Sequence, residues 1–348
     1  MSLKVEIKKR FKGFHLDVSF ETNNEYLGLL GASGCGKSMT LKCIAGVVTP
    51  DEGSIVLNGR VLFDSKKKIN LKPQDRNIGF LFQNYALFPN MTVEENIATG
   101  LKLSKNEKKP IVEDMIKSFH LKGLEYKYPN QLSGGQQQRA ALARSIAYNP
   151  DVLLLDEPFS ALDSHLKLQV QAEMSELLRL YNGEVLMVTH SIDEAYKFCK
   201  NLVVISNGKS VLFGNTREIF REPKLISVAK LIGCNNISEC SLKSNNIIHA
   251  KDWDVELTLN RKASDVKYIG IRSNSFVINH SNDEENIIEC EIIEIIEKVY
   301  GYTIIFRSKN SNVGDYMYFD VKKETWDKRE NKTNLFLKVC EDSILLLN

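Results

Sequence analysis

The feature that most constrains the fold is a glycine-rich loop between an apolar strand and a helix. The loop reads Gly31-Ala-Ser-Gly-Cys-Gly-Lys37-Ser38. Residues 26–30 before it form a short apolar run typical of a buried strand, and residues 39–45 after it have a helical pattern. This order is the structural context of a phosphate-binding loop. The segment therefore predicts an α/β fold that holds a phosphorylated ligand at the start of the helix.

Each residue type in the loop has a physical role in phosphate binding. Glycines let backbone N–H groups converge on phosphate oxygens, and the helix N-terminus adds partial positive charge. Lys37 supplies a cation for the β- and γ-phosphates, and the Ser38 hydroxyl is a natural Mg²⁺ ligand. Cys35 has a plain alternative as an inert small residue. The expected phosphate-binding residues are Gly31, Ser33, Gly34, Cys35, Gly36, Lys37, Ser38 and Met39.

Two carboxylates follow the apolar run 152–155. Strand-end side chains of this kind project at the carboxyl edge of a sheet, where nucleotides bind in open α/β folds. Asp156 can bind Mg²⁺ directly or through water, and Glu157 can polarise the water that attacks a γ-phosphate. An Asp-Glu pair alone is usually a solvated turn. Here Pro158 after the pair and the glycine-rich loop upstream favour a nucleotide site instead.

A second anion-binding helix end is predicted at Leu132-Ser-Gly-Gly-Gln136, which precedes a helical stretch over 137–147. Ser133, Gly134 and Gly135 suit a helix N-terminus that faces an anion. One nucleotide does not need two such ends from one subunit. We therefore expect two copies to assemble head to tail, each completing the pocket of the other. The alternative is an ordinary serine cap with a flexible glycine turn.

Together these segments resemble an ABC-type ATPase subunit over residues 1–230, which implies ATP and Mg²⁺ as cofactors and a second copy as partner. In that resemblance Gln83 is the Q-loop glutamine, which contacts Mg²⁺ and acts in catalysis with Glu157. His190 is the switch histidine that senses the γ-phosphate. Asp163 ends the D-loop segment 160–163, and Ser133 to Gln136 cover the partner's nucleotide. An aromatic side chain stacks on adenine, and Phe14 is preferred over Phe11.

The resemblance also implies membrane partners. Subunits with one cassette and no spanning helices work in pairs on the cytoplasmic side of a transmembrane permease, peripheral to the membrane and indirectly linked to an external substrate-binding protein. ATP binding closes the pair, and a groove over about 84–93 carries the closure to the permease. Phe88 and Met91 are candidate contacts there, with internal packing as the alternative.

The chain divides into two predicted domains. Residues 1–230 read as a nucleotide-binding domain whose near-continuous apolar strands suit a parallel sheet covered on both faces, with a helical subdomain over about 84–150. Residues 235–348 carry many short apolar runs between polar turns, which predict a small all-β domain. Within it 287–299 fits a strand or a helix, and its β-branched content favours a strand. This tail resembles the oligonucleotide-binding-like regulatory domain of importer ATPases.

The importer branch is indicated by weaker features. Segments 58–65 and 83–89 look most like the molybdate/tungstate or sulfate branch. Residues 270–275 read Gly-Ile-Arg-Ser-Asn-Ser and depart from the Gly-Ile-Arg-Pro-Glu-His of many importer tails. The sequence thus favours an oxyanion importer, with a sugar, polyamine or iron importer as the alternatives.

Composition narrows the remaining function classes. Lys and Arg number 46 against 44 Asp and Glu, a net charge of +2, so nucleic acid is not an expected partner. Seven scattered cysteines without a CxxC pair fit a reducing cytoplasm. The N-terminus lacks a signal-like apolar stretch, and no run approaches the roughly 18 residues of a membrane span, so the chain is expected to be soluble by itself. A soluble ABC ATPase of translation or DNA repair and a generic P-loop kinase remain as alternatives.

Overall fold

A computed structural model of the chain describes residues 2–23, 25–160, 164–179, 181–280, 284–311, 315–329 and 335–348. It contains two compact units, Met1–Arg217 and Glu218–Asn348. The sequence placed the domain boundary further along, at 230–235. Residues before that point already pack with the second unit, because Ala229 and Cys234 bury against Leu345 and Leu347. Among the described helices, none is long and apolar enough to cross a membrane.

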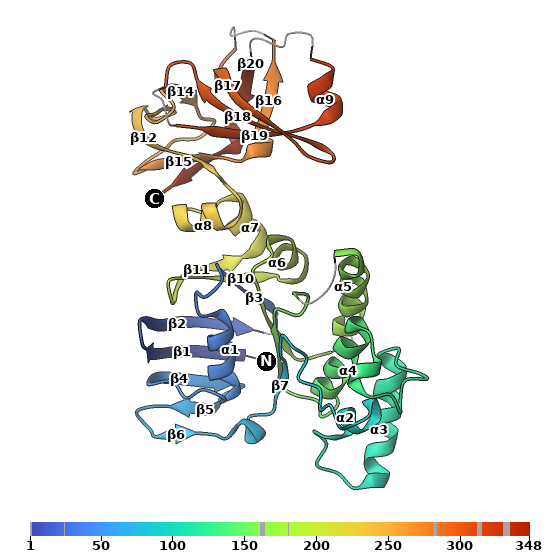
Figure 1. Cartoon of the computed structure of the whole chain (residues 1–348). Coiled ribbons are helices and arrows are strands. Elements are labelled where there is room, and N and C mark those ends of the chain that lie inside the picture. The colour runs from blue at the N-terminus through green and yellow to red at the C-terminus, as the bar shows by residue number, and fades with distance from the viewer. Residues whose placement is uncertain are drawn as a thin grey trace. The chain divides into compact units, whose positions relative to one another are not determined.

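The first unit is built on an eleven-stranded sheet with the order β6-β5-β4-β1-β2-β11-β10-β3-β9-β8-β7 (Figure 1). The strands are β1 (Ser2–Phe11), β2 (Phe14–Asn23), β3 (Tyr26–Leu30), β4 (Glu52–Leu57), β5 (Arg60–Asp64), β6 (Ile69–Asn70), β7 (Ile78–Leu81), β8 (Val152–Asp156), β9 (Glu184–Thr189), β10 (Asn201–Ser206) and β11 (Lys209–Asn215).

The sheet is mixed, which corrects the expectation of a parallel sheet. Strands β10, β3, β9, β8 and β7 are parallel neighbours, and they include the apolar runs 26–30 and 152–155 seen in the sequence. Strands β1, β2, β4 and β5 pair antiparallel. Burial in β1 and β2 alternates along much of each strand, so one face of this half packs on the core and the other meets solvent. A tight turn at Asn58-Gly59 joins β4 to β5, with both residues at positive φ.

The helices of the first unit are α1 (Lys37–Ala45), α2 (Val93–Ala98), α3 (Lys105–Ser118), α4 (Gly134–Ile146), α5 (Ser164–Arg179) and α6 (Ile192–Phe198), with short 3₁₀ turns at Pro73–Asp75 and Pro129–Gln131. Helices α2, α3 and α4 gather beside the β7 end of the sheet (Figure 1). This is the stretch in which the sequence predicted a helical subdomain.

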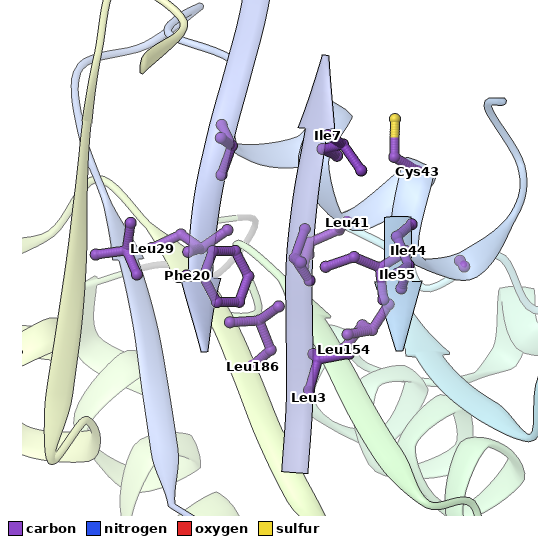
Figure 2. Close-up of a cluster of buried hydrophobic side chains, with 14 of the residues drawn as sticks. Leu3, Ile7, Phe20, Leu29, Leu41, Cys43, Ile44, Ile55, Leu154 and Leu186 are labelled. Atoms are coloured by element: carbon purple, nitrogen blue, oxygen red, sulfur yellow. The ribbon is translucent and has the colours of Figure 1, made fainter. Parts of the chain in front are cut away.

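The core beneath the glycine-rich loop fixes where that loop starts and ends. Leu27 and Leu29 of β3 and Leu41 and Ile44 of α1 are fully buried in one cluster with residues of β1, β4, β8 and β9 (Figure 2). Burying an aliphatic side chain of this size stabilises by about 1.5–3 kcal/mol. The strand before the loop and the helix after it are therefore both anchored by packing.

The second unit is all-β apart from short helices, as the sequence predicted. One five-stranded sheet has the order β14-β13-β12-β15-β21 and the other β16-β20-β17-β18-β19. The strands are β12 (Asn236–Ser244), β13 (Ile247–Ala250), β14 (Val255–Thr258), β15 (Tyr268–Ile271), β16 (Phe276–Asn279), β17 (Ile287–Glu297), β18 (Gly301–Ser308), β19 (Met317–Lys322), β20 (Leu335–Val339) and β21 (Ile344–Leu347). The helices are α7 (Thr216–Arg221), which begins at the end of the first unit, α8 (Ile226–Leu231) and α9 (Lys323–Asp327).

Both sheets of this unit bury side chains in one core that includes Trp253, Phe276 and Phe306. Strand β17 confirms the preference for a strand over a helix at 287–299.

Candidate nucleotide-binding site

The loop between β3 and α1 can be made only with its glycines. Gly34 and Gly36 have φ values of 78° and 106°, which other residues adopt only with strain. A Cβ on Gly36 would lie 3.0 Å from Cζ of Phe14, and one on Gly31 would lie 2.3 Å from the carbonyl oxygen of Ile205. The glycine spacing read from the sequence is thus required by the backbone, and it leaves a cradle open to a ligand.

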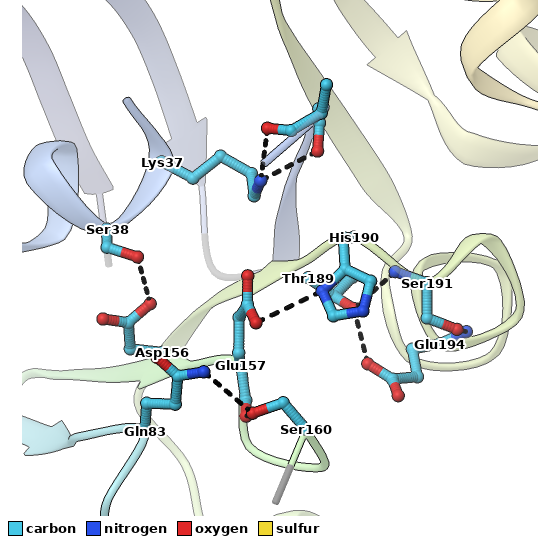
Figure 3. Close-up of polar contacts among 12 residues, drawn as sticks. Lys37, Ser38, Gln83, Asp156, Glu157, Ser160, Thr189, His190, Ser191 and Glu194 are labelled. Atoms are coloured by element: carbon cyan, nitrogen blue, oxygen red, sulfur yellow. Dashed lines mark hydrogen bonds and ion pairs between the residues drawn. The ribbon is translucent and has the colours of Figure 1, made fainter. Parts of the chain in front are cut away.

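Lys37 places a buried cation in that cradle. Its Nζ donates hydrogen bonds to the carbonyl oxygens of Gly31 at 2.8 Å and Ala32 at 2.9 Å, and the residue is only 4% exposed (Figure 3). Across the described ranges, no carboxylate forms an ion pair with this ammonium group. Because its acceptors are neutral, its charge is available to phosphate oxygens.

Ser38 and Asp156 meet at the edge of the sheet although they are far apart in the sequence. The Ser38 hydroxyl donates to Oδ1 of Asp156 at 2.7 Å (Figure 3). Asp156 is buried at the end of β8, and this burial raises the pKa of its carboxyl group. A hydroxyl and a carboxylate are the hard oxygen donors that Mg²⁺ prefers beside substrate phosphates and water. The donor set therefore fits Mg²⁺, although the described residues hold no cluster of three protein ligands that could form an all-protein cage.

Glu157 and His190, the residues that directly follow β8 and β9, face each other. Oε2 of Glu157 lies 3.2 Å from Nδ1 of His190, with side chains 17% and 58% exposed (Figure 3). Glu157 has a φ of 46°, and its N–H donates to the carbonyl oxygen of Val188 on β9. A non-glycine residue in this region costs about 1–3 kcal/mol and is typical of functional sites. The structure therefore brings two of the three predicted catalytic residues, Glu157 and His190, together.

Ser160 links Gln83 to the backbone of Glu157. Gln83, which follows β7, donates from Nε2 to Oγ of Ser160 at 3.2 Å, and the Ser160 hydroxyl donates to the carbonyl oxygen of Glu157 at 3.0 Å. The sequence identified Ser160 only as the first residue of the segment 160–163. Its contact with Gln83 could not be seen in the sequence, because Gln83 lies in the loop after β7, far from Ser160 along the chain. Asp163 lies outside the described residues.

A buried network supports the backbone around His190. The Thr189 hydroxyl accepts a hydrogen bond from the Ser191 N–H at 2.9 Å and donates to Glu194, which forms an ion pair with Lys167 at 2.7 Å. Glu194 is only 4% exposed. These residues carry no motif, and the sequence analysis missed them.

A cavity of about 370 Å³ opens over the loop. Its lining consists of Phe11, Phe14, Ser33, Gly34, Gly36, Lys37, Ser38, Met39, Gln83 and Glu157. The two aromatic rings belong to the β1–β2 hairpin, with centroids 6.2 Å apart, so both candidates for stacking on a base reach the cavity. Cys35 instead packs into the core cluster, where burial raises the pKa of its thiol.

The predicted second anion-binding end does not lie in this cavity. Ser133 caps α4, because its Oγ accepts from the Gln136 N–H at 3.4 Å and Oε1 of Gln136 accepts from the Ser133 N–H at 2.9 Å. Ser133 and Gly134 are exposed, whereas Gly135 is buried, and a Cβ there would come within 3.3 Å of Val170. The start of α4 is therefore formed and open to solvent in a single copy.

The segment after Gln83 has one exposed aromatic side chain. Tyr85 and Ala86 have positive φ values, and Arg144 donates to the carbonyl oxygens of both. The Arg144 guanidinium also lies 5.5 Å from the ring centre of Phe88, which is 45% exposed. Met91 is half-buried and accepts a hydrogen bond from Thr99. Of the two candidate contacts, Phe88 is the more accessible.

Comparison with known proteins gives three kinds of relative. Residues 15–160 match the family described as ABC transporter. The molybdate/tungstate import ATP-binding protein of Methanocaldococcus jannaschii is 38% identical over 330 residues, 93% of this chain and 99% of that protein. A probable sulfate/thiosulfate import ATP-binding protein of Chlorella vulgaris is 44% identical over 67% of this chain and 99% of its own length. A spermidine/putrescine import ATP-binding protein of Oleidesulfovibrio alaskensis is 41% identical over 65% of this chain, and the match spans 61% of that relative.

Two solved structures match part of this chain. A dimeric ATP-binding cassette in a post-hydrolysis state with ADP and Pi superposes with a TM-score of 0.52 at 28% identity, over 62% of this chain and 99% of that one. A dimeric bacterial ABC transporter cassette gives a TM-score of 0.53 at the same identity and coverage.

Proposed function

This chain belongs to the ABC transporter ATPase family, and from that premise we propose that it hydrolyses ATP to power a membrane importer. The observation that carries the proposal is the convergence of Lys37, Ser38, Asp156, Glu157 and His190 on one sheet edge. A kinase would share the first three. The paired Glu157 and His190, with a second helix end left open at Ser133, favour the transporter ATPase.

The binding step follows from the loop. The backbone amides of the loop and the Lys37 ammonium group hold the phosphates, and Phe14 or Phe11 stacks on the base. Ser38, Asp156 and Gln83 would hold Mg²⁺, which when bound neutralises charge on the β- and γ-phosphates.

The hydrolytic step belongs to Glu157. Its carboxylate can accept a hydrogen bond from a water placed in line with the γ-phosphate, a role worth about 10²–10⁴ in rate. In this proposal His190, whose Nδ1 lies beside that carboxylate, would hold it and contact the γ-phosphate. Ser160 connects Gln83 to the Glu157 backbone, so the position of the glutamine is tied to that of the base.

Two copies complete each site in this proposal. The N-terminus of α4, with Ser133, Gly134, Gly135 and Gln136, would cover the nucleotide held by the other copy, and Asp163 would lie at the same interface. The helix has 13 residues, long enough for a full end-charge at its N-terminus. The two solved cassettes that this chain resembles are dimeric.

A direct test of the proposed activity is phosphate release by the purified chain with Mg²⁺ and ATP. Turnover is expected for the wild type. We expect a loss of about 10²-fold or more for Lys37→Ala, because it removes the cation from the phosphates. Absence of turnover by a folded wild-type dimer, or full activity of the variant, would contradict the assignment.

We further propose that the pair sits on the cytoplasmic side of the membrane against a permease, with the external binding protein reached only through it. Phe88 is exposed beside the Arg144 anchor and suits such a contact. Phe88→Ala is expected to reduce co-purification with the permease without lowering ATP hydrolysis by the free chain. Phe213→Ala is the matched control, because Phe213 is 49% exposed on β11. Equal retention of the permease by both variants would argue against this surface.

The cargo we propose is an oxyanion such as molybdate, tungstate or sulfate. The molybdate/tungstate relative aligns over 93% of the chain, through the β-rich unit that we propose is regulatory. A polyamine is the second candidate, because a spermidine/putrescine relative from Clostridioides difficile aligns over 89% of the chain at 36% identity. Uptake of molybdate, tungstate, sulfate and spermidine by a strain lacking this chain separates the two. Loss of spermidine uptake alone would overturn the oxyanion proposal.

A further inference from the structure

Arg76 is a fully buried cation whose partners are all neutral. It is 0% exposed, and its Nη1 donates to the carbonyl oxygens of Cys43 at 3.0 Å and Ile44 at 2.7 Å. Its Nε donates to the carbonyl oxygen of Leu71 at 2.9 Å, and Nη2 donates to Oδ1 of Asn70 at 2.8 Å. Within the described ranges it has no carboxylate partner.

The counter-charge of Arg76 is the end of a helix. Cys43 and Ile44 lie in the last turn of α1, where the carbonyl groups carry the partial negative charge of the helix end, and the Cys43 carbonyl also accepts the Gly46 N–H. The Cys43 thiol is neutral, because burial raises its pKa to about 12. A planar guanidinium can reach several carbonyl groups at fixed angles, which a lysine ammonium group cannot.

Gly46 is shaped to fit this guanidinium. It caps the C-terminus of α1 with a φ of 80°. A Cβ at this position would lie 2.5 Å from Nε and 2.7 Å from Cζ of Arg76. Arg76 and Gly46 are distant in the sequence and make one close-packed clamp.

The clamp connects the two elements, α1 and β7, whose other ends lie at the nucleotide cavity. Helix α1 has nine residues, and its first two, Lys37 and Ser38, line the cavity. Strand β7 begins just after Arg76, and Gln83 beyond its other end also lines the cavity. The start of α1 and the end of β7 thus meet at the site, while Arg76 joins the end of α1 to the start of β7.

We propose that Arg76 is a positioning residue for the nucleotide, which fixes Lys37 and Ser38 relative to Gln83 by clamping the far ends of α1 and β7. The inference rests on the proposed function, since it requires that the cavity bind Mg²⁺ and ATP. Freeing the end of α1 lets the helix tilt, so the phosphate-binding groups lose their alignment. The effect is therefore on nucleotide affinity and goes beyond a general loss of stability.

The test uses the full chain and three variants. Arg76→Met removes all four hydrogen bonds. Arg76→Lys keeps the charge without the planar geometry, and Gly46→Ala pushes on the guanidinium from the other side. The dissociation constant of a fluorescent trinitrophenyl-ATP is measured with Mg²⁺, well below each melting temperature. Arg76→Met and Gly46→Ala are each expected to weaken binding by about tenfold or more, and Arg76→Lys by less. The double variant that combines Arg76→Met with Gly46→Ala is expected to bind the probe no more weakly than the worse single variant, because both substitutions break the same clamp.

Tyr148→Phe is the matched control. The Tyr148 hydroxyl donates to the carbonyl oxygen of Ile78 at 2.8 Å, at the start of β7, and this bond does not involve α1. This variant is expected to lower the melting temperature and leave the dissociation constant within about twofold of wild type.

The outcomes separate the clamp from the proposed function. Wild-type affinity in folded Arg76→Met overturns the clamp. If that variant does not fold, wild-type affinity in both Arg76→Lys and Gly46→Ala overturns it instead. A loss of affinity in Tyr148→Phe as large as in the clamp variants also overturns it, because general destabilisation would then explain the effect. Failure of the wild type itself to bind the probe overturns the proposed function, and the role of Arg76 with it.

Discussion

The folded chain alone disfavours the charged form of the Asp156 carboxyl group. It is 5% exposed, and its burial outweighs the hydrogen bond from Ser38 in raising its pKa. A carboxylate whose pKa is raised on folding destabilises the native state wherever it is charged. The cost is therefore present at neutral pH and disappears as the pH falls below the ordinary aspartate range. Such stored cost is typical of a ligand site.

Replacing Asp156 by asparagine is expected to raise the melting temperature of the nucleotide-free chain near neutral pH and to abolish Mg²⁺-dependent nucleotide binding. The gain in melting temperature over wild type should shrink as the pH is lowered, because wild-type Asp156 then becomes neutral. Thermal unfolding across a pH series, with and without Mg²⁺ and ATP, measures both effects. A variant less stable than wild type at neutral pH would show that the charge is already compensated.

How far the sequence predicts this site depends on the distance between partners. Lys37 and Ser38 were predictable because their roles follow from a local strand, loop and helix. Asp156 was predictable because parallel strands end at a common edge. The contacts of Ser160 with Gln83 and of Arg76 with α1 were not predictable, because these partners lie on other elements that are distant in the sequence.

Helix α4 has a structural cap that is also the predicted interface group. Ser133 satisfies a backbone N–H of the first turn, as any good N-cap does, and its exposure leaves the helix end free for an anion. The cap and the phosphate contact can be separated, because aspartate caps a helix as well as serine but repels phosphate.

Ser133→Asp is therefore expected to keep the melting temperature of the wild type and to lose ATP hydrolysis by about 10²-fold or more. Ser133→Ala should instead lower stability by about 1 kcal/mol, because it removes the cap. Melting curves and phosphate release on both variants distinguish the roles. Normal turnover by Ser133→Asp would show that this helix end never faces a phosphate.

At the level of elements, near-continuous apolar runs indicated parallel strands such as β3 and β8, and much of the antiparallel half was missed. Charged side chains alternate with apolar ones along the long hairpin of β1 and β2, so it contains no continuous apolar run for local pattern to detect. The strand order also requires pairings between distant segments, such as β10 with β3, that no local pattern encodes.

The chain as a whole divides into units whose cores are separate clusters. The first residues of the second unit belong to its packing, since Ala229 and Cys234 are fully buried against Leu345 and Leu347. Composition changes near 235, but burial places these earlier residues with the β-rich unit.

A fragment of residues 218–348 is therefore expected to unfold cooperatively and at a higher temperature than a fragment of residues 235–348. The shorter piece exposes the apolar surface around Leu345 and Leu347. Circular dichroism melts of the two fragments measure the difference. Equal melting temperatures would show that 218–234 contribute nothing to this unit. If the longer fragment melts at the higher temperature, as expected, it is the fragment to screen against molybdate, tungstate and sulfate.

The central claim is that two copies close on ATP, and the Glu157→Gln variant tests it most directly. Because glutamine keeps the size of the side chain but cannot act as a base, the variant should bind ATP without turning it over. Sedimentation velocity with Mg²⁺ and ATP is predicted to show a dimer that is absent without nucleotide and absent when Lys37→Ala is added. A Glu157→Gln chain that binds ATP and stays monomeric would contradict the account.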